Sequence, residues 1–346
     1  MNSPLVSTII PTYNRYELVC SAIDSVLDQT YDNIEIIVVD DGSSDETASL
    51  QKRYKEKIRY FHQPNAGLSS ARNLAMQAAR GNYVSLLDDD DLWTPHKTEI
   101  QVACLENLPR CAFVFSDFEI FNDNGTVAAL GLSTWFDSEP DWRDIFSKLI
   151  TIGLESANNA PLKPFVGNLY HHLLAYPYVL PSTAIFRRSA VATRHPFPEN
   201  NTHCGDWAFF AELSRHYPCA FIPEPLARNR SHDDPVRLTR KMESTKLYDR
   251  YDMIQRVWGV DEDFKMQHAS VLRTQQLKTR IAIIRALLKE GQTKKARLEI
   301  KNVRKEGQDV PLLEMQLYFF LSFFPFWMNL KRRIQRSLPQ FNNRKS

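Results

Sequence analysis

The chain has 346 residues, of which 43% are hydrophobic, and its 43 Lys and Arg residues against 41 Asp and Glu residues give a net charge of +2 at pH 7. This length is enough for two domains or for one large domain with an appendage, and the near-neutral charge gives no sign of a polyanionic partner such as nucleic acid. The 5 cysteines include no C-x-x-C pair and are odd in number, so neither a disulfide framework nor a zinc ribbon is indicated, and a reducing compartment fits best.

Strands and helices alternate in the amino-terminal part of the chain. Runs of Val, Ile and Leu predict the strands, and apolar residues at helical spacing predict the helices between them. Ser43-Ser44-Asp45-Glu46 matches a capping box, which places a helix start directly after Asp40-Asp41-Gly42. This alternation predicts a doubly wound α/β fold. In chain order we expect strand Val6–Ile10, helix Glu17–Gln29, strand Ile34–Val39, helix Asp45–Tyr54, strand Ile58–Phe61, helix Ser69–Arg80 and strand Tyr83–Leu87.

The regular alternation stops after a further strand, expected at Ala112–Ser116. Asn124-Gly125 is typical of a hairpin turn and would bring Phe118–Phe121 back on Val127–Leu130. Residues 131–180 show no clear periodicity, so we expect loops and short helices that shape a pocket. The elements expected after residue 180 are strand Ser182–Arg187, helix Asp206–Arg215 and amphipathic helices at Lys241–Val257, Asp263–Lys289, Thr293–Arg304 and Leu312–Phe324.

Four adjacent aspartates, Asp88 to Asp91, follow the expected strand Tyr83–Leu87 at its carboxyl end. Because neighbouring carboxylates repel one another unless a cation holds them, the run predicts a divalent metal site. Open α/β sheets bind their ligands at the carboxyl ends of the strands, which is where this run lies. The alternative is a solvated acidic turn.

Several motifs occur in an order and spacing that resemble those of one family. They are Val6–Arg15 (VSTIIPTYNR), Gln29-Thr30-Tyr31, Glu35–Asp45 (EIIVVDDGSSD) and the aspartate tetrad. Over about residues 5–235 the chain resembles the family-two glycosyltransferases of GT-A fold. The resemblance implies a Rossmann-like, mostly parallel central sheet with flanking helices, followed here by a C-terminal helical region. We therefore expect a nucleotide-sugar-binding α/β subdomain at 1–115, an acceptor-binding part at 116–238 and a helical region with a basic tail at 239–346.

The resemblance implies that the loops after the first strands bind the donor. Asp41 matches an aspartate that typically contacts uracil, which indicates a UDP-sugar. Helix capping is the structural alternative, and it suits Asp45 better. Arg72 occupies the place of a family arginine near the donor sugar and phosphates, with a surface helix arginine as the alternative. The donor-binding residues expected are Pro11, Thr12, Tyr13, Asn14, Asp40, Asp41, Arg72, Asp88, Asp89 and Arg230.

The family's D-x-D pattern maps onto Asp88-x-Asp90, where Mg²⁺ or Mn²⁺ would bridge carboxylates to both phosphates. We rank Asp90 first as the metal ligand, above Asp88 and Asp89, because four adjacent acids leave the register open by one residue. Asp89 would then lie near the donor ribose or sugar, and Asp91 could cap the next turn.

Leu226–His232 resembles a later family segment in which a histidine completes the metal sphere and an arginine meets the diphosphate. His232 and Arg230 match these two roles. A lone histidine is also often a structural residue, and we interpret His171, His172 and His195 as structural or surface residues.

Asp206 matches an acidic family residue at the start of a helix that lines the acceptor site. Inversion at the anomeric carbon needs a base beside the acceptor hydroxyl, and a helix N-terminus favours the ionised carboxylate. Many members carry Glu-Asp here, whereas this chain has Gly205-Asp206. The alternative is an ordinary N-cap, with Trp207 in the core instead of stacking on a sugar.

The segment 317–346 combines aromatic residues with a basic flank, which suits the interface of an anionic membrane. The alternative is a final helix packed on the core with a frayed basic tail. No secretory signal precedes the first expected strand, and no stretch reaches the roughly 20 apolar residues of a spanning helix. We expect a cytoplasmic enzyme, with the tail docked on the cytoplasmic face of the inner membrane as a hypothesis.

Together these features predict an inverting glycosyltransferase of hexosyl or N-acetylhexosaminyl type, with Mn²⁺ or Mg²⁺, a nucleotide-sugar donor and a glycan or lipid-linked acceptor in cell-surface polysaccharide or glycolipid synthesis. One alternative is a sugar-phosphate nucleotidyltransferase, which should carry a Gly-rich phosphate loop where this chain has Pro11-Thr12-Tyr13-Asn14. The other is a non-catalytic nucleotide-sugar or glycan-binding protein, against which the intact Asp90 and Asp206 speak. The sequence names neither the sugar nor the acceptor.

Overall fold

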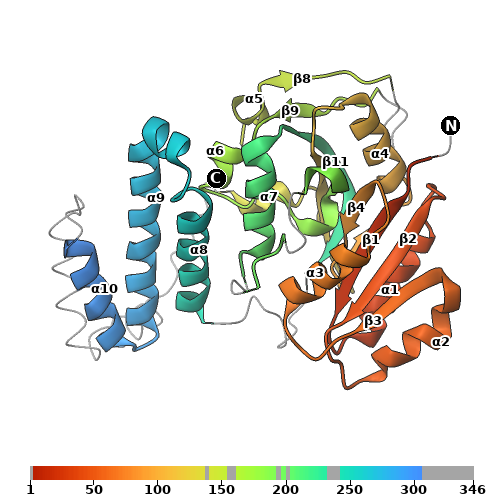
Figure 1. Ribbon diagram of the computed structural model, residues 1–346, viewed down its shortest axis with the longest axis horizontal. Coiled ribbons are helices and arrows are strands. Elements are labelled where there is room, and N and C mark those ends of the chain that lie inside the picture. The colour runs from red at the N-terminus through yellow and green to blue at the C-terminus, as the bar shows by residue number, and fades with distance from the viewer. Residues whose placement is uncertain are drawn as a thin grey trace, which may run out of the picture. The chain divides into compact units, whose positions relative to one another are not determined.

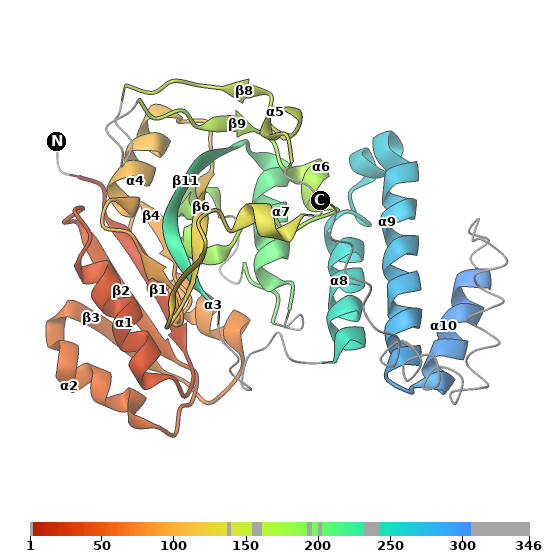
Figure 2. The same ribbon diagram turned by 180° about the vertical axis from the view of Figure 1, so that it is seen from behind.

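The computed structural model describes residues 3–136, 140–153, 161–191, 196–199, 203–231 and 242–305. The chain divides into two compact units, residues 1–236 and residues 237–346. Figures 1 and 2 show them from opposite sides, the first unit coloured from red to green and the second from teal to blue. His195, His232 and the segments 312–324 and 317–346, for which the sequence makes predictions, lie outside the described residues.

The amino-terminal half of the first unit is a parallel sheet, in which β1 lies between β2 and β4, and β3 pairs with β2. Every residue of β1 and β4 is buried, as expected for parallel strands that are covered on both faces. The predicted alternation of strands and helices is confirmed here. The elements are β1 (Val6–Thr12), α1 (Tyr16–Leu27), β2 (Ile34–Asp40), β3 (Ile58–His62), α3 (Leu68–Ala78) and β4 (Tyr83–Leu86).

The segment between β2 and β3 differs from its prediction. Instead of one helix at Asp45–Tyr54, a 3₁₀ turn, η1 (Glu46–Ser49), precedes the short helix α2 (Leu50–Tyr54) and the turn η2 (Lys55–Lys57). The Asp45 carboxylate accepts a hydrogen bond from the Thr47 amide at 3.0 Å. Asp45 is therefore the capping residue, whereas Ser43, the first residue of the predicted capping box, accepts a hydrogen bond from the Asn14 amide instead.

The other half of the sheet mixes strand directions. β10 runs antiparallel between β4 and β6, and β11 runs parallel to β6. The strands predicted at Ala112–Ser116 and Phe118–Phe121 form one continuous strand, and the predicted strand Ser182–Arg187 begins as a 3₁₀ turn. The elements are β5 (Leu92–Trp93), α4 (Lys97–Asn107), β6 (Phe113–Asn122), β7 (Gly125–Ala128), η3 (Leu132–Trp135), α5 (Trp142–Ile145), β8 (Lys148–Leu149), β9 (Phe165–Gly167), α6 (Tyr170–Leu173), η4 (Pro181–Thr183), β10 (Ile185–Arg187), η5 (Arg188–Ala190) and α7 (Gly205–His216).

The strand β11 (Cys219–Arg230) is absent from the predicted elements, as is α4. Pro223 and Pro225 interrupt the β11 sequence, and proline is unfavourable in a central strand because it donates no ladder hydrogen bond. Register shifts against β6 on both sides of Pro225 accommodate the irregularity. The strand carries Asn229 and Arg230 to hydrogen-bonding distance of Asp91.

The second unit contains three described helices, α8 (Glu243–Val257), α9 (Glu262–Lys289) and α10 (Thr293–Lys305), each within two residues of a predicted helix. Both views show α9 between α8 and α10 (Figures 1 and 2). Ile283, Ile284, Leu287, Ile300 and Val303 are buried together between α9 and α10. Among the described helices, none is both long and apolar enough to cross a bilayer.

Candidate active site

The loops that leave β1, β2 and β4 meet at the carboxyl edge of the parallel strands. Thr12 at the end of β1 is in register with Asp40 at the end of β2, and β4 lies on the other side of β1. This edge is the usual ligand site of an open α/β sheet. The sequence therefore brings the PTYN segment, the aspartate pair and the aspartate tetrad to one place.

The loop after β1 is fastened to the tetrad. The Thr12 hydroxyl donates a hydrogen bond to Asp89 Oδ2 at 2.8 Å. The Arg15 guanidinium contacts Asp89 Oδ1 at 3.0 Å and Asp90 Oδ2 at 3.2 Å. Sequence reasoning missed Arg15, although it ends the motif that contains Asn14. Its charge offsets part of the repulsion between the carboxylates.

Burial disfavours the ionised form of the carboxyl groups in the tetrad. Asp89, Asp90 and Asp91 are between 1% and 7% exposed. Burial raises the pKa of Asp89 to about 7 against the opposing charge of Arg15. Burial and the neighbouring Asp90 and Asp88 hold the pKa of Asp91 well above its usual range. Arg15 and Arg72, which pairs with Asp88, supply part of the positive charge that the ionised tetrad needs, and a divalent cation would add more.

The tetrad fits a cation that takes few protein ligands. Among the described residues, no three His, Cys, Asp or Glu side chains are arranged as a complete metal site. Asp88 is partly exposed, and Asp90 lies beside it in the same loop. Mg²⁺ is usually held by one or two carboxylates with substrate phosphates completing its shell. The oxygen donors of Asp88 and Asp90 match that chemistry.

The sequence suggested that Asp91 caps the following turn, and this prediction is wrong. The Asp91 carboxylate instead accepts hydrogen bonds from distant parts of the chain. Its Oδ2 accepts a hydrogen bond from the Ser182 hydroxyl at 2.6 Å. Its Oδ1 accepts from the Asn229 side chain at 2.9 Å and from the Arg230 amide at 3.2 Å. The Ser182 oxygen in turn accepts from the Asp88 amide at 3.1 Å. These long-range bonds fix the tetrad between β4, η4 and β11.

Arg72 on α3 joins two of the predicted site residues. Its side chain is fully buried, so the alternative of a surface helix arginine is wrong. One guanidinium nitrogen donates to Asp88 Oδ1 at 2.7 Å, and another forms an ion pair with Asp206. Burial alone would lower the pKa of Arg72, but the two carboxylates outweigh it and raise that pKa. The guanidinium also lies 5.6 Å from the centre of the Phe197 ring.

Asp206 lies in the first turn of α7, and its carboxylate side chain is 30% exposed. The N-cap residue is Cys204, so Asp206 is not an ordinary N-cap. A Cβ at Gly205 would lie 2.8 Å from the Ser69 hydroxyl oxygen. Helices α7 and α3 therefore approach each other closely at Gly205.

The aspartate pair after β2 organises the adjacent loops. Burial would raise the pKa of Asp40, but hydrogen bonds from Ser43, Tyr60 and His62 outweigh burial and lower it. Asp41 Oδ1 accepts from Gln63 at 2.6 Å and from the Ala66 amide at 2.9 Å, and Oδ2 accepts from the Gly67 amide at 2.8 Å. Asp41 therefore fixes the loop before α3, in addition to the contact with uracil that the family resemblance implies.

Tyr13 and Asn14 continue the same edge beyond the buried Pro11. Tyr13 is 38% exposed, and its ring is available to a ligand. Asn14 has a left-handed backbone with φ of 54°, its amide donates to the Ser43 hydroxyl at 2.8 Å, and its side chain accepts from the Ser44 amide at 2.7 Å. The first two loops thus hold each other in place.

The guanidinium of Arg230, predicted to meet the diphosphate, is directed to Asp123 and Phe121. That group forms an ion pair with Asp123 at 2.7 Å and lies 4.6 Å from the centre of the Phe121 ring. In the part of the chain that the structure describes, its contact with Asp91 is made by the backbone amide, at 3.2 Å. Trp207 donates its indole N–H to the Leu173 carbonyl at 2.6 Å, which ties α7 to α6.

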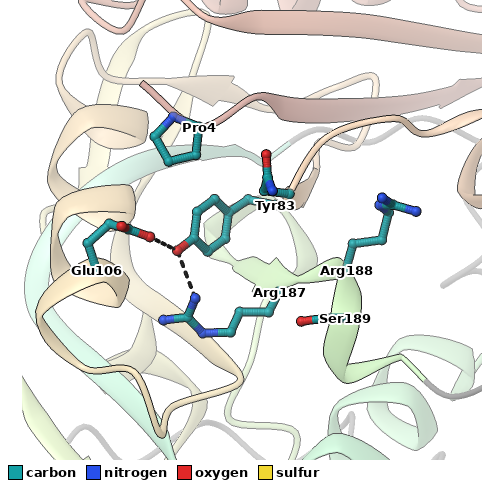
Figure 3. A pocket seen from close by; sticks show the side chains of 7 residues that line it. Pro4, Tyr83, Glu106, Arg187, Arg188 and Ser189 are labelled. Carbon is teal, nitrogen blue, oxygen red and sulfur yellow. Dashed lines mark hydrogen bonds between the residues drawn. The ribbon is translucent and has the colours of Figure 1, made fainter. Parts of the chain in front are cut away.

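A cavity of about 510 Å³ lies at the opposite, amino-terminal edge of the sheet. Figure 3 shows the Tyr83 hydroxyl between Glu106 and Arg187 on its wall. Arg187 donates to that hydroxyl at 2.8 Å and to the Leu105 carbonyl at 2.7 Å, and the hydroxyl donates to Glu106. These groups satisfy one another and lie away from the predicted site residues, so we assign them a structural role.

Residues 7–151 match the family model described as glycosyl transferase family 2. This region belongs to that family. An uncharacterized glycosyltransferase of Rickettsia typhi is 34% identical over 232 residues, which are 67% of this chain and 65% of the relative. The UDP-Glc:alpha-D-GlcNAc-diphosphoundecaprenol beta-1,3-glucosyltransferase WfgD of Escherichia coli is 38% identical over 130 residues, 37% of this chain and 51% of the relative. The chain thus spans less than two thirds of the length of these curated relatives.

Solved structures confirm the predicted GT-A fold of the family 2 domain. Residues 1–349 of S. aureus TarS in complex with UDP-GlcNAc align with a TM-score of 0.54 at 17% identity, covering 95% of this chain and 92% of TarS. The mannosyltransferase PcManGT from Pyrobaculum calidifontis, in complex with GDP-Man and Mn²⁺, also has a TM-score of 0.54, at 16% identity and with 95% and 87% covered.

Proposed function

We propose that the chain is an inverting glycosyltransferase that moves a hexosyl or N-acetylhexosaminyl group from a UDP-sugar to a glycan or lipid-linked acceptor in cell-surface polysaccharide or glycolipid synthesis. The match of residues 7–151 to the family 2 glycosyltransferase model supports the transferase class. The UDP donor is supported by the UDP-GlcNAc complex of the TarS structure and by the substrate named for WfgD. The acceptor class is likewise supported by the name of WfgD.

The single observation that carries the proposal is the bridge from Asp88 through Arg72 to Asp206. It places a carboxylate of the tetrad and the partly exposed Asp206 on opposite sides of one guanidinium. In-line displacement needs a donor-side cluster and an acceptor-side base held in fixed relation. In this proposal Asp206 accepts the proton of the acceptor hydroxyl as that oxygen attacks the anomeric carbon.

On the donor side, we assign Asp90 and Asp88 to Mg²⁺ or Mn²⁺, which supplies neutralisation of the diphosphate leaving group when bound. A Mn²⁺ complex of the structurally similar PcManGT supports this choice. Asp89 would face the donor ribose or sugar. The other donor-binding proposals are Pro11, Thr12, Tyr13, Asn14, Asp40, Asp41, Arg72 and Arg230, and the metal role of His232 concerns a residue outside the described ranges.

The division at 1–115, 116–238 and 239–346 into donor, acceptor and helical parts belongs to the same proposal. The cytoplasmic location stays a prediction. So does the contact of 317–346 with the inner membrane, because that segment lies outside the described residues.

The test compares Asp206→Asn and Asp90→Asn with Asp32→Asn, a matched charge loss at an exposed residue. We expect Asp206→Asn to abolish UDP-sugar turnover while it retains Mn²⁺-dependent UDP binding, measured by titration calorimetry. Asp90→Asn should lose both, and Asp32→Asn should lose neither. Full turnover in Asp206→Asn would mean that another residue is the catalytic base. Release of pyrophosphate from a nucleoside triphosphate would favour a nucleotidyltransferase, and binding without turnover in the unaltered chain would favour a non-catalytic protein.

A further inference from the structure

Helix α10 concentrates positive charge in the second unit. Its 13 residues include six cationic side chains and a single acid, Glu299. Glu299 pairs with the buried Arg280 at 2.7 Å, and its own side chain is only 13% exposed. The one negative charge of the helix is therefore already neutralised inside the unit.

The positive side chains lie on the side of α10 that faces away from α9. Ala296, Ile300 and Val303 are buried, and Ile300 and Val303 pack with the α9 residues Ile283 and Ile284. Lys294, Lys301 and Lys305 are exposed at i, i+7 and i+11, a spacing that places them along one face of the helix. We call these three residues, with Leu298 between them, the basic face of α10.

The basic face is not a balanced solvated surface. Lys294, Lys301 and Lys305 form no salt bridge with any part of the chain that the structure describes. Helix α8 of the same unit provides the comparison, because its sequence contains three acidic and three basic residues. The acidic and basic residues of α8 balance each other, so the excess positive charge is particular to α10 and is not shared by every helix of this unit.

The exposed Leu298 favours a lipid bilayer over a soluble polyanion as the partner of the basic face. It is 60% exposed and lies one turn from Lys294 and near Lys301 and Lys305 on the same face. Anionic lipid headgroups attract clustered lysines, and an apolar side chain among them can enter the acyl boundary. A soluble polyanion would use the lysines but would leave Leu298 in water.

From this charge complementarity we infer that the basic face of α10 docks on an anionic lipid bilayer. The inference concerns residues 293–305 and does not rest on the proposed transfer reaction. It is also separate from the prediction for 317–346, because every residue it uses is described.

The test is co-sedimentation of the full chain with phosphatidylcholine vesicles, with and without phosphatidylglycerol. One variant replaces Lys294, Lys301 and Lys305 by Gln. A matched control replaces the exposed Lys52, Lys57 and Lys148 of the first unit by Gln, which removes the same charge from the chain. We expect the α10 variant to bind phosphatidylglycerol vesicles at least tenfold more weakly and the control to bind like the unaltered chain.

Two further measurements separate the possible partners. Leu298→Gln should weaken vesicle binding several-fold without changing its salt dependence, because it alters the apolar contact and leaves the charges in place. Equal binding of the α10 variant and the control would overturn the inference, as would binding that needs no phosphatidylglycerol. Retention of the unaltered chain on heparin but not on the vesicles would also overturn it, in favour of a soluble polyanion.

Discussion

Arg72 and Asp206, which are 134 positions apart in the sequence, form an ion pair between helices α3 and α7. The arginine is fully buried, whereas the aspartate is partly open to solvent. A buried guanidinium requires a carboxylate partner, and here it has one on each side, Asp88 and Asp206. The same pair therefore stabilises the fold and sets the position of the proposed base relative to the tetrad.

We predict that Arg72→Met will lower the free energy of unfolding by about 3 kcal/mol, because it leaves Asp88 and Asp206 facing each other without a cation. Arg72→Lys should recover only part of the loss, since one ammonium cannot bridge two carboxylates as the planar guanidinium does. Both variants should lose most sugar transfer. Urea unfolding and a transfer assay check the two effects separately.

The control is Arg53→Met, which removes an ion pair with Asp24 whose two side chains are 47% and 51% exposed. Such a solvent-exposed pair should contribute little to the free energy of unfolding. Equal stability losses in Arg72→Met and Arg53→Met would contradict the structural role of the bridge.

Replacing Asp91 or Asp90 by alanine should have different effects on stability and on ligand binding. Asp91→Ala removes the acceptor for three donors, the buried Ser182 hydroxyl and the partly buried Asn229 side chain and Arg230 amide. We expect a loss of about 2 kcal/mol and a melting temperature lower by about 4–8 °C. Asp90→Ala should melt closer to the unaltered chain but lose the stabilisation that UDP and Mn²⁺ give together.

Thermal melting with and without UDP and Mn²⁺ measures both effects on the same samples. If Asp90→Ala melted below Asp91→Ala in the absence of ligands, the division into a structural and a metal-facing aspartate would be reversed.

The sequence predicts the parts of the site that depend on local patterns. Apolar runs ending in polar residues located β1, β2 and β4, and the motifs at their ends brought Thr12, Asp40 and Asp88 to one edge. Asp45 was recognised as a cap because its partner, Thr47, lies two residues away. Such contacts are readable because the residues that make them are neighbours in the chain.

The parts that were missed depend on residues far apart. Asp91 was expected to cap a turn because its true partners, Ser182 and Asn229, are 91 and 138 positions away. Arg72 could be read as a surface residue because nothing in its helix shows that two carboxylates will cover it. β11 was overlooked because its prolines hide a strand that only the pairing with β6 makes possible.

Lys97 on α4 gives a prediction that depends on pH. Its ammonium group is fully buried, 3.3 Å from the Ser85 hydroxyl and 4.0 Å from the centre of the Trp93 ring, and it forms no salt bridge with a described residue. Burial holds the pKa of Lys97 well below its ordinary value of 10.5. The native chain therefore binds fewer protons at this position than the unfolded chain between the depressed pKa and 10.5.

Because the unfolded state binds more protons in that window, the contribution of Lys97 to the free energy of unfolding rises with pH, by at most about 1.4 kcal/mol per unit. Lys97→Met should be more stable than the unaltered chain at neutral pH, and the difference should shrink as the pH approaches 10.5. Urea unfolding between about pH 7 and about pH 10 measures the difference. The exposed Lys57→Met should show none of this dependence, since water solvates that ammonium group in both states. Parallel stability curves for Lys97→Met and the unaltered chain would mean that the buried amine keeps its proton, held by Trp93 and Ser85 strongly enough to offset the cost of burial.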